Sequence, residues 1–142
     1  MQDLCDFCHY EGHVQEHHVF ALWAAECEER VLALFEAESP DDARPREAIE
    51  AARKWQRGEL PMTDARKLAF ASHAAARESS SLAAVAAARA AGHAAATAHV
   101  VTHAPHAARY AQKATEAAGL DTEAERRWQI ERLPEQLRQI IE

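Results

Sequence analysis

The segment from Leu82 to Tyr110, LAAVAAARAAGHAAATAHVVTHAPHAARY, constrains the fold of this chain most strongly. About half of its residues are alanine, the best helix former, and it lacks the Gly or Ser runs that are typical of a flexible linker. Side chains this small also let neighbouring helices approach to about 8 Å. The segment therefore predicts a closely packed central helical rod, with a kink or a restart at Pro105.

The rest of the chain predicts further helices joined by short loops. Apolar residues recur at steps of three and four, and no long alternating run of β-branched residues indicates a strand. Helices are expected at about residues 19–38, 45–57, 63–78, 82–118 and 122–132, with a short terminal turn or helix at 135–141. Several ends carry the usual residues: a serine N-cap at 79–81, Gly58 and Gly119 after helix ends, and a capping box at 122–125. The predicted fold class is all-α, a single-domain bundle of five or six helices with an Ala-rich central helix.

The first eighteen residues differ in composition from the rest of the chain. Residues 1–18 contain two cysteines and four histidines and show no helical stripe, so we expect a Cys/His-rich segment at 1–18 and a helical domain at 19–142. Cys5, Cys8, His13 and His18 have a spacing close to that of a zinc knuckle, with His18 where the last cysteine would stand. His17 is an alternative ligand, since His13 and His17 are four residues apart.

Two other interpretations of this segment stay open. Cys5 to His9 also matches the C-x-x-C-H string for haem attachment, although covalent haem is installed outside the cytosol and no signal peptide is evident. The remaining interpretation is a frayed terminus with free thiols. Zinc is thus the one cofactor that the sequence suggests.

The second group of histidines lies in the alanine-rich segment. His99, His103, His106 and Tyr110 would share one face of a continuous rod, while His93 would lie about 120° from His99 and share a face with Thr97. His73 on the preceding helix is a candidate to join them. His93, His99 and His103 are predicted either to be buried polar groups bonded to the backbone or to serve a metal or proton-transfer role. No nucleophile motif, phosphate loop or H-E-x-x-H string accompanies them, so an enzyme is not indicated.

Charge is distributed unevenly along the chain. Residues 1–50 contain thirteen Asp and Glu against three Lys and Arg, whereas residues 51–142 are slightly basic. An acidic chain is a poor candidate for nucleic-acid binding, because phosphate neutralisation supplies most of that affinity. No apolar run approaches the roughly 20 residues of a membrane span, and three cysteines without an export signal favour a reducing, cytoplasmic setting.

Five stretches spread over these helices resemble the immunity-5-like family of bacterial immunity proteins. They are ALWAAECEERVLALFE (21–36), SPDDARPREAIEAARKWQRGEL (39–60), AFASHAAARE (69–78), AAGHAAATAHVVTHA (90–104) and RRWQIERLPEQLR (126–138). The resemblance covers about residues 19–142 and leaves the Cys/His-rich segment outside.

The resemblance implies an all-helical, non-catalytic cytoplasmic protein that binds and neutralises a cognate bacterial toxin. It supplies no catalytic residues. The turn containing Asp41, Asp42 and Arg44 is predicted to be a partner contact, since acidic residues suit a basic effector. Two alternatives remain: a zinc-binding helical protein of unknown role, and a homo-oligomer assembled through its Ala-rich faces.

Overall fold

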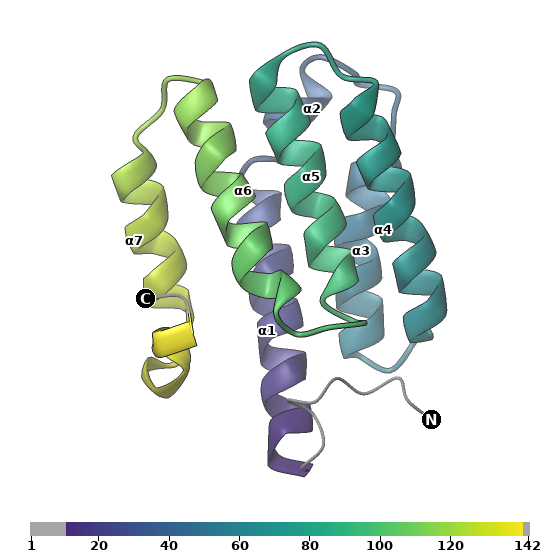
Figure 1. Cartoon of the computed structure of the whole chain (residues 1–142), viewed down its shortest axis with the longest axis vertical. Coiled ribbons are helices and arrows are strands. Elements are labelled where there is room, and N and C mark those ends of the chain that lie inside the picture. The colour runs from purple at the N-terminus through teal and green to yellow at the C-terminus, as the bar shows by residue number, and fades with distance from the viewer. Residues whose placement is uncertain (1–10, 141–142) are drawn as a thin grey trace.

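A computed structural model of the chain describes residues 11–140, and the side chains of residues 16–139. The described residues form seven α-helices and no strand (Figure 1). The helices are α1 (Glu11–Glu29), α2 (Leu32–Glu36), α3 (Arg44–Gln56), α4 (Met62–Arg77), α5 (Leu82–Ala96), α6 (His103–Ala117) and α7 (Thr122–Arg132), followed by the 3-10 helix η2 (Glu135–Ile140). The all-α class is therefore confirmed, but the predicted five or six helices are too few.

Helix α5 is the centre of the bundle. It packs against α1, α2, α3, α4 and α6, and every one of its buried residues is alanine or glycine. In Figure 1, α5 and α6 lie side by side in front of α1, with α4 on one side and α7 on the other. The small alanine side chains of α5 thus allow five helices to pack closely around it.

The bulky core side chains come mainly from the helices around α5. Phe20 and Trp23 of α1, Phe35 of α2 and Ile49 of α3 are almost fully buried. Large groups facing a small-residue helix fill the interior in the interdigitating manner of close-packed cores. None of the helices in residues 11–140 is long and apolar enough to cross a membrane.

Most predicted helix ends are found in the structure. Ser81 caps α5, its hydroxyl accepting a hydrogen bond from the Ala84 amide at 3.0 Å. Gly58 and Gly119 have φ of +77° and +76°, the left-handed conformation expected just after a helix. The capping box at 122–125 is wrong in register, because Asp121 is the residue that caps α7, accepting from the Ala124 amide.

The predicted rod from Leu82 to Tyr110, with a kink or a restart at Pro105, is wrong. Helix α5 ends at Ala96 and α6 begins at His103, so the segment folds back as a helical hairpin. The intervening residues 97–102 include two threonines and two valines, which are weaker helix formers than alanine. Pro105 does not mark the break; it lies in the first turn of α6, where a missing N–H costs no helical hydrogen bond.

The predicted first helix, 19–38, is also wrong at its start and in being unbroken. Helix α1 begins at Glu11, so the expected boundary between residues 18 and 19 lies within it, and a tight turn at residues 30–31 separates α1 from α2. Tertiary contacts explain the early start, since His17 is buried and packs on Trp55 of α3. Sequence periodicity does not register contacts of this kind.

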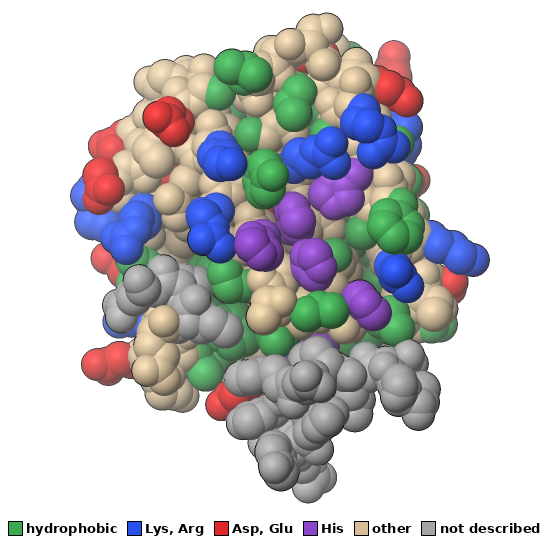
Figure 2. Space-filling model, in the orientation of Figure 1, with side chains coloured by type: hydrophobic (Ala, Val, Ile, Leu, Met, Phe, Trp, Pro, Cys, Tyr) green, Lys and Arg blue, Asp and Glu red, His purple; other side chains and the backbone are tan. Residues whose placement is uncertain are grey.

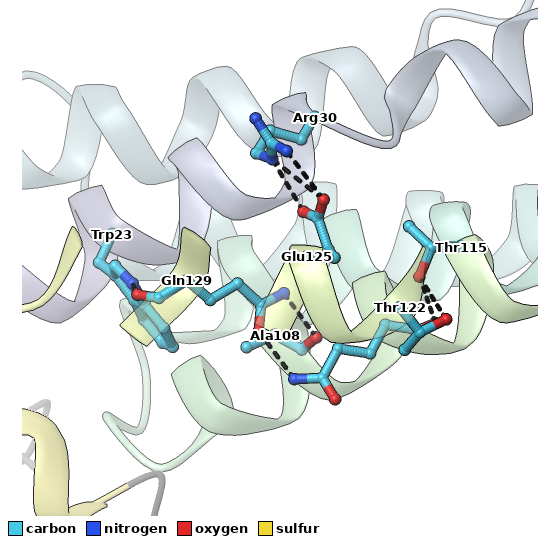
Figure 3. Close-up of polar contacts among 8 residues, drawn as sticks. Trp23, Arg30, Ala108, Thr115, Thr122, Glu125 and Gln129 are labelled. Atoms are coloured by element: carbon cyan, nitrogen blue, oxygen red, sulfur yellow. Dashed lines mark hydrogen bonds and ion pairs between the residues drawn. The ribbon is translucent and has the colours of Figure 1, made fainter. Parts of the chain in front are cut away.

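Helix α7 is attached largely through polar groups (Figure 3). The Trp23 indole donates to the Gln129 carbonyl at 2.8 Å, and the buried Gln129 amide donates to the Ala108 carbonyl at 3.0 Å. Arg30 donates to both carboxylate oxygens of Glu125. These contacts tie α7 to α1 and α6.

Candidate functional site

Four imidazole rings and one phenol meet on the exposed side of α4, α5 and α6. We call His73, His93, His103, His106 and Tyr110 the histidine cluster. His93 is its centre: its ring centroid lies 5.1 Å from His73, 5.2 Å from His103, 5.6 Å from His106 and 5.1 Å from Tyr110. The hairpin brings the α6 side chains to α5, and the packing of α4 on α5 adds His73.

Gly92 makes room for His73. A Cβ atom at position 92 would lie 2.7 Å from Cε1 and Nε2 of the His73 ring, closer than van der Waals contact permits. Glycine in the middle of a helix costs roughly 1 kcal/mol relative to alanine. In a helix otherwise so rich in alanine, this glycine is explained by the ring that lies over it.

The imidazoles of His73 and His93 are neutral near pH 7. Burial, followed by the neighbouring charges of Arg89, His103 and Arg77, lowers the pKa of His73 to about 4. Burial, followed by His73 and His103, lowers the pKa of His93 to about 3. Nδ1 of His93 and Nδ1 of His103 are 3.0 Å apart, a hydrogen bond that needs one of them to carry a proton and the other a lone pair.

The cluster has groups that donate and accept hydrogen bonds, but among the described residues it has no carboxylate partner. No carboxylate is among the groups that shift the pKa of His73, His93 or His103, so no acid is placed to orient or polarise these rings. Among the described residues, no three His, Cys, Asp or Glu side chains are grouped closely enough to hold a metal ion. What the cluster can do is donate and accept hydrogen bonds and stack against flat groups.

Cationic side chains surround the histidine cluster. Figure 2 shows the histidines gathered on one face among Lys and Arg side chains, with most Asp and Glu toward the margins. Arg109 Nη2 lies 3.4 Å from His106 Nδ1, and Lys113 Nζ lies 4.7 Å from the Tyr110 ring centroid. Arg77, Arg89, Arg109 and Lys113 form no ion pair within the described part of the chain, in contrast to the arginines of α3.

The structure does not place the predicted histidines as the rod implied. His99 lies in the turn between α5 and α6, so it does not share a face with His103 and His106. Its Nδ1 is buried and has no hydrogen-bond partner among the described residues. Thr97 meets His93 through the backbone, donating its hydroxyl to the His93 carbonyl at 3.0 Å, while the His93 ring faces α6.

The predicted zinc ligands fall mostly beyond what the structure describes. Cys5 and Cys8 lie outside the described residues, as does the side chain of His13, whose backbone belongs to α1. His18 packs edge-on against Trp55, with ring centroids 4.8 Å apart. His17 donates through Nε2 to the Thr97 carbonyl, and burial lowers its pKa.

The predicted contact turn is held by ion pairs of its own. Arg44 bonds to Asp42 at 2.7 Å and to Glu78, at the end of α4, at 2.6 Å. Asp41 is exposed. The turn is thus anchored to α4, and its role in partner binding stays a prediction.

Sequence reasoning missed the convergence of the histidine cluster because it missed the hairpin. In an antiparallel pair of helices, residues at equal distance from the turn lie opposite one another. The middle of the turn at 97–102 falls between His99 and Val100, so His93 and His106 are equally far from it. A break assigned to those β-branched residues would have placed the two histidines together.

Fold and site together define a small all-α bundle with an exposed, cation-rimmed histidine cluster. The family follows from comparison: the chain belongs to the family described as Imm-5 like putative immunity protein, whose model matches residues 12–136. The predicted resemblance is therefore confirmed, and the match begins earlier than residue 19, within the first turn of α1. No curated protein and no solved structure matches the chain.

Proposed function

We propose that this chain is an immunity protein that binds a cognate bacterial toxin and neutralises it without catalysis. The observation that carries the proposal is membership of the immunity-protein family across residues 12–136. The match spans all seven α-helices, so the whole bundle is the unit to which the proposal applies.

The chemistry of the described residues supports a binding role. No carboxylate among the described residues shifts the pKa of His73 or His93, and burial keeps both imidazoles neutral near pH 7. Stoichiometric inhibition requires a rigid surface, and the close packing around α5 supplies one.

Co-expression with each candidate toxin whose gene lies beside the gene of this chain tests the proposal. Cells carrying an inducible toxin should stop growing, and growth should return when the chain is expressed with it. Rescue should be specific: an unrelated toxin should kill the same cells. The purified pair should elute as one complex with a fixed stoichiometry.

Loss of toxicity through chemical change would contradict the non-catalytic part of the proposal. Intact mass spectrometry of the toxin, after incubation with a substoichiometric amount of the chain, distinguishes the two mechanisms. A binder leaves the toxin mass unchanged and inhibits only one equivalent. Failure to rescue any linked toxin would overturn the proposal as a whole.

A further inference from the structure

We propose that the exposed face of α4, α5 and α6 is the partner-binding surface, and that it docks an acidic protein surface of the toxin. We call this surface the α4–α5–α6 face; this inference rests on the proposed function for the identity of the partner. Its residues are Phe70, His73 and Arg77 of α4, Leu82, Arg89 and His93 of α5, and His106, Arg109, Tyr110 and Lys113 of α6.

The face consists of one outward stripe from each helix. Phe70, His73 and Arg77 follow at steps of three and four, as do His106, Tyr110 and Lys113. Arg89 and His93 are four residues apart on the helix between them. Side chains at these spacings lie on one side of a helix, so three packed helices present them together.

The charges of this face have no internal partners, unlike those of the opposite helices. Acidic residues of the first third are engaged within the chain: Glu29 and Glu50 bond to Arg53, and Glu36 bonds to Arg46. Arg77, Arg89, Arg109 and Lys113 have no such ion pair among the described residues. Four unpaired cations around a hydrogen-bonding centre favour carboxylates on the partner.

Apolar groups on the same face favour a protein over a polyanion. Phe70 is 59% exposed and Leu82 is 78% exposed, although both are large hydrophobic side chains. Leu82 also lines a shallow hollow with Val85, Ala86 and Lys113, where Glu116 and Ala117 complete the lining. Arginines and aromatic groups around apolar anchors are the usual composition of a protein interface.

This assignment differs from one based on the acidic N-terminal third. The sequence suggested that acidic residues would meet a basic toxin, but several of those acids are neutralised by arginines of α3. Arg77, Arg89, Arg109 and Lys113 of α4, α5 and α6, by contrast, have no ion pair among the described residues. Charge complementarity therefore points to an acidic patch on the toxin.

Paired charge reversals test the surface. Arg109→Glu/Lys113→Glu changes two exposed cations of the face, and Lys54→Glu/Arg57→Glu makes the same change of charge on and just after α3. Titration calorimetry with the linked toxin should show binding weakened at least about tenfold by the first pair, since exposed charge pairs contribute up to about 1 kcal/mol each. The second pair should stay within about threefold of the unaltered chain. Thermal unfolding should confirm that both variants fold.

The salt dependence of binding and a variant of an apolar residue give two further tests of the α4–α5–α6 face. Raising ionic strength should weaken the unaltered chain more than the Arg109→Glu/Lys113→Glu variant, because fewer charges remain to be screened. Phe70→Ala should weaken binding with little change in salt dependence. Equal affinity of both charge variants would overturn the surface assignment and leave the proposed function standing.

If no linked toxin binds, the proposed function is excluded. A second measurement then tests whether the α4–α5–α6 face is a binding surface. The full chain is titrated with a synthetic peptide of alternating Glu and Leu while its imidazole and Tyr110 NMR resonances are followed. Shifts confined to the α4–α5–α6 face, absent with a Lys and Leu peptide, support an acidic protein ligand. Shifts elsewhere, or a response to single-stranded DNA alone, would overturn it.

Discussion

Glu28 is a buried carboxyl group without a hydrogen-bond partner among the described residues. It is 1% exposed, and burial, followed by the charge of Glu125, raises its pKa well above 4.5. The folded protein therefore holds a proton here that the unfolded chain releases above about pH 4.5. The sign is fixed by linkage: this group makes folding less favourable as pH rises from 4.5 toward the folded pKa.

Replacing Glu28 with Gln should remove that pH dependence. The variant should become more stable relative to the unaltered chain as pH rises. The difference in free energy of unfolding should grow by up to about 1.4 kcal/mol per pH unit above 4.5. Urea unfolding at pH 4.5, 6 and 7.5 measures the difference, with Glu26→Gln as the control on the same helix. Parallel stabilities across this range would show that Glu28 is ionised in the folded state.

His93 should change the stability of the protein with pH in the direction opposite to Glu28. Its pKa is lowered from 6.5 to about 3, by burial first and then by His73, His103, His106 and Arg89. A base with a depressed folded pKa contributes no penalty above pH 6.5, and stability is lost as pH falls from 6.5 toward 3. His93→Gln should therefore lose less stability than the unaltered chain over this interval, by up to about 1.4 kcal/mol per pH unit. His106→Gln, at the exposed edge of the cluster, is the matched control, and an equal effect of both would contradict the assignment.

At the scale of helices, the packing of α4 on α5 depends on the absence of a Cβ atom at Gly92. Alanine normally stabilises a helix relative to glycine, but at position 92 it would meet the His73 ring at 2.7 Å. Gly92→Ala should destabilise the protein by about 1 to 3 kcal/mol, as overpacking does. The double variant Gly92→Ala/His73→Ala should recover most of this loss. A stabilised single variant in thermal unfolding would mean that the ring moves aside freely.

The attachment of helix α7 to the bundle should depend on the side chain of Gln129. Its side-chain amide donates to the Ala108 carbonyl, and its side-chain oxygen accepts from Gln112 at 2.8 Å. Gln129→Ala leaves both partners without these bonds and should cost about 2 to 4 kcal/mol. Hydrogen exchange should speed up in α7 before the other helices. Uniform acceleration through the bundle would instead show that α7 unfolds only with the whole domain.

At the scale of the whole molecule, the sequence predicted helix content well and topology less well. Alanine propensity, the Ser81 cap and the glycines after helix ends are local properties, and the structure has them where they were expected. The hairpin turn at 97–102 and the early start of α1 depend on tertiary contacts such as that of His17 with Trp55. The histidine cluster follows from the hairpin rather than from spacing along one helix, so predicting it required the break at 97–102 to be recognised first.

The N-terminal segment leaves one prediction for the intact chain. Cys5, Cys8, His13 and His18 have zinc-knuckle spacing, but α1 is helical from Glu11. His17 is buried and bonded to the Thr97 carbonyl, whereas His18 is only half-buried. If zinc binds, His18 therefore remains the predicted fourth ligand rather than His17.

Elemental analysis of the untagged protein, beside its Cys5→Ser/Cys8→Ser variant, tests that prediction. If the segment binds zinc, the protein should contain one zinc per chain, lost in the cysteine variant and weakened by His18→Ala. Chelator should then lower the melting temperature of the unaltered chain and leave the cysteine variant unchanged, because bound metal stabilises only the folded state. Protein isolated without metal, and indifferent to chelator, would exclude the zinc site. The helical bundle would then carry the function with its own side chains.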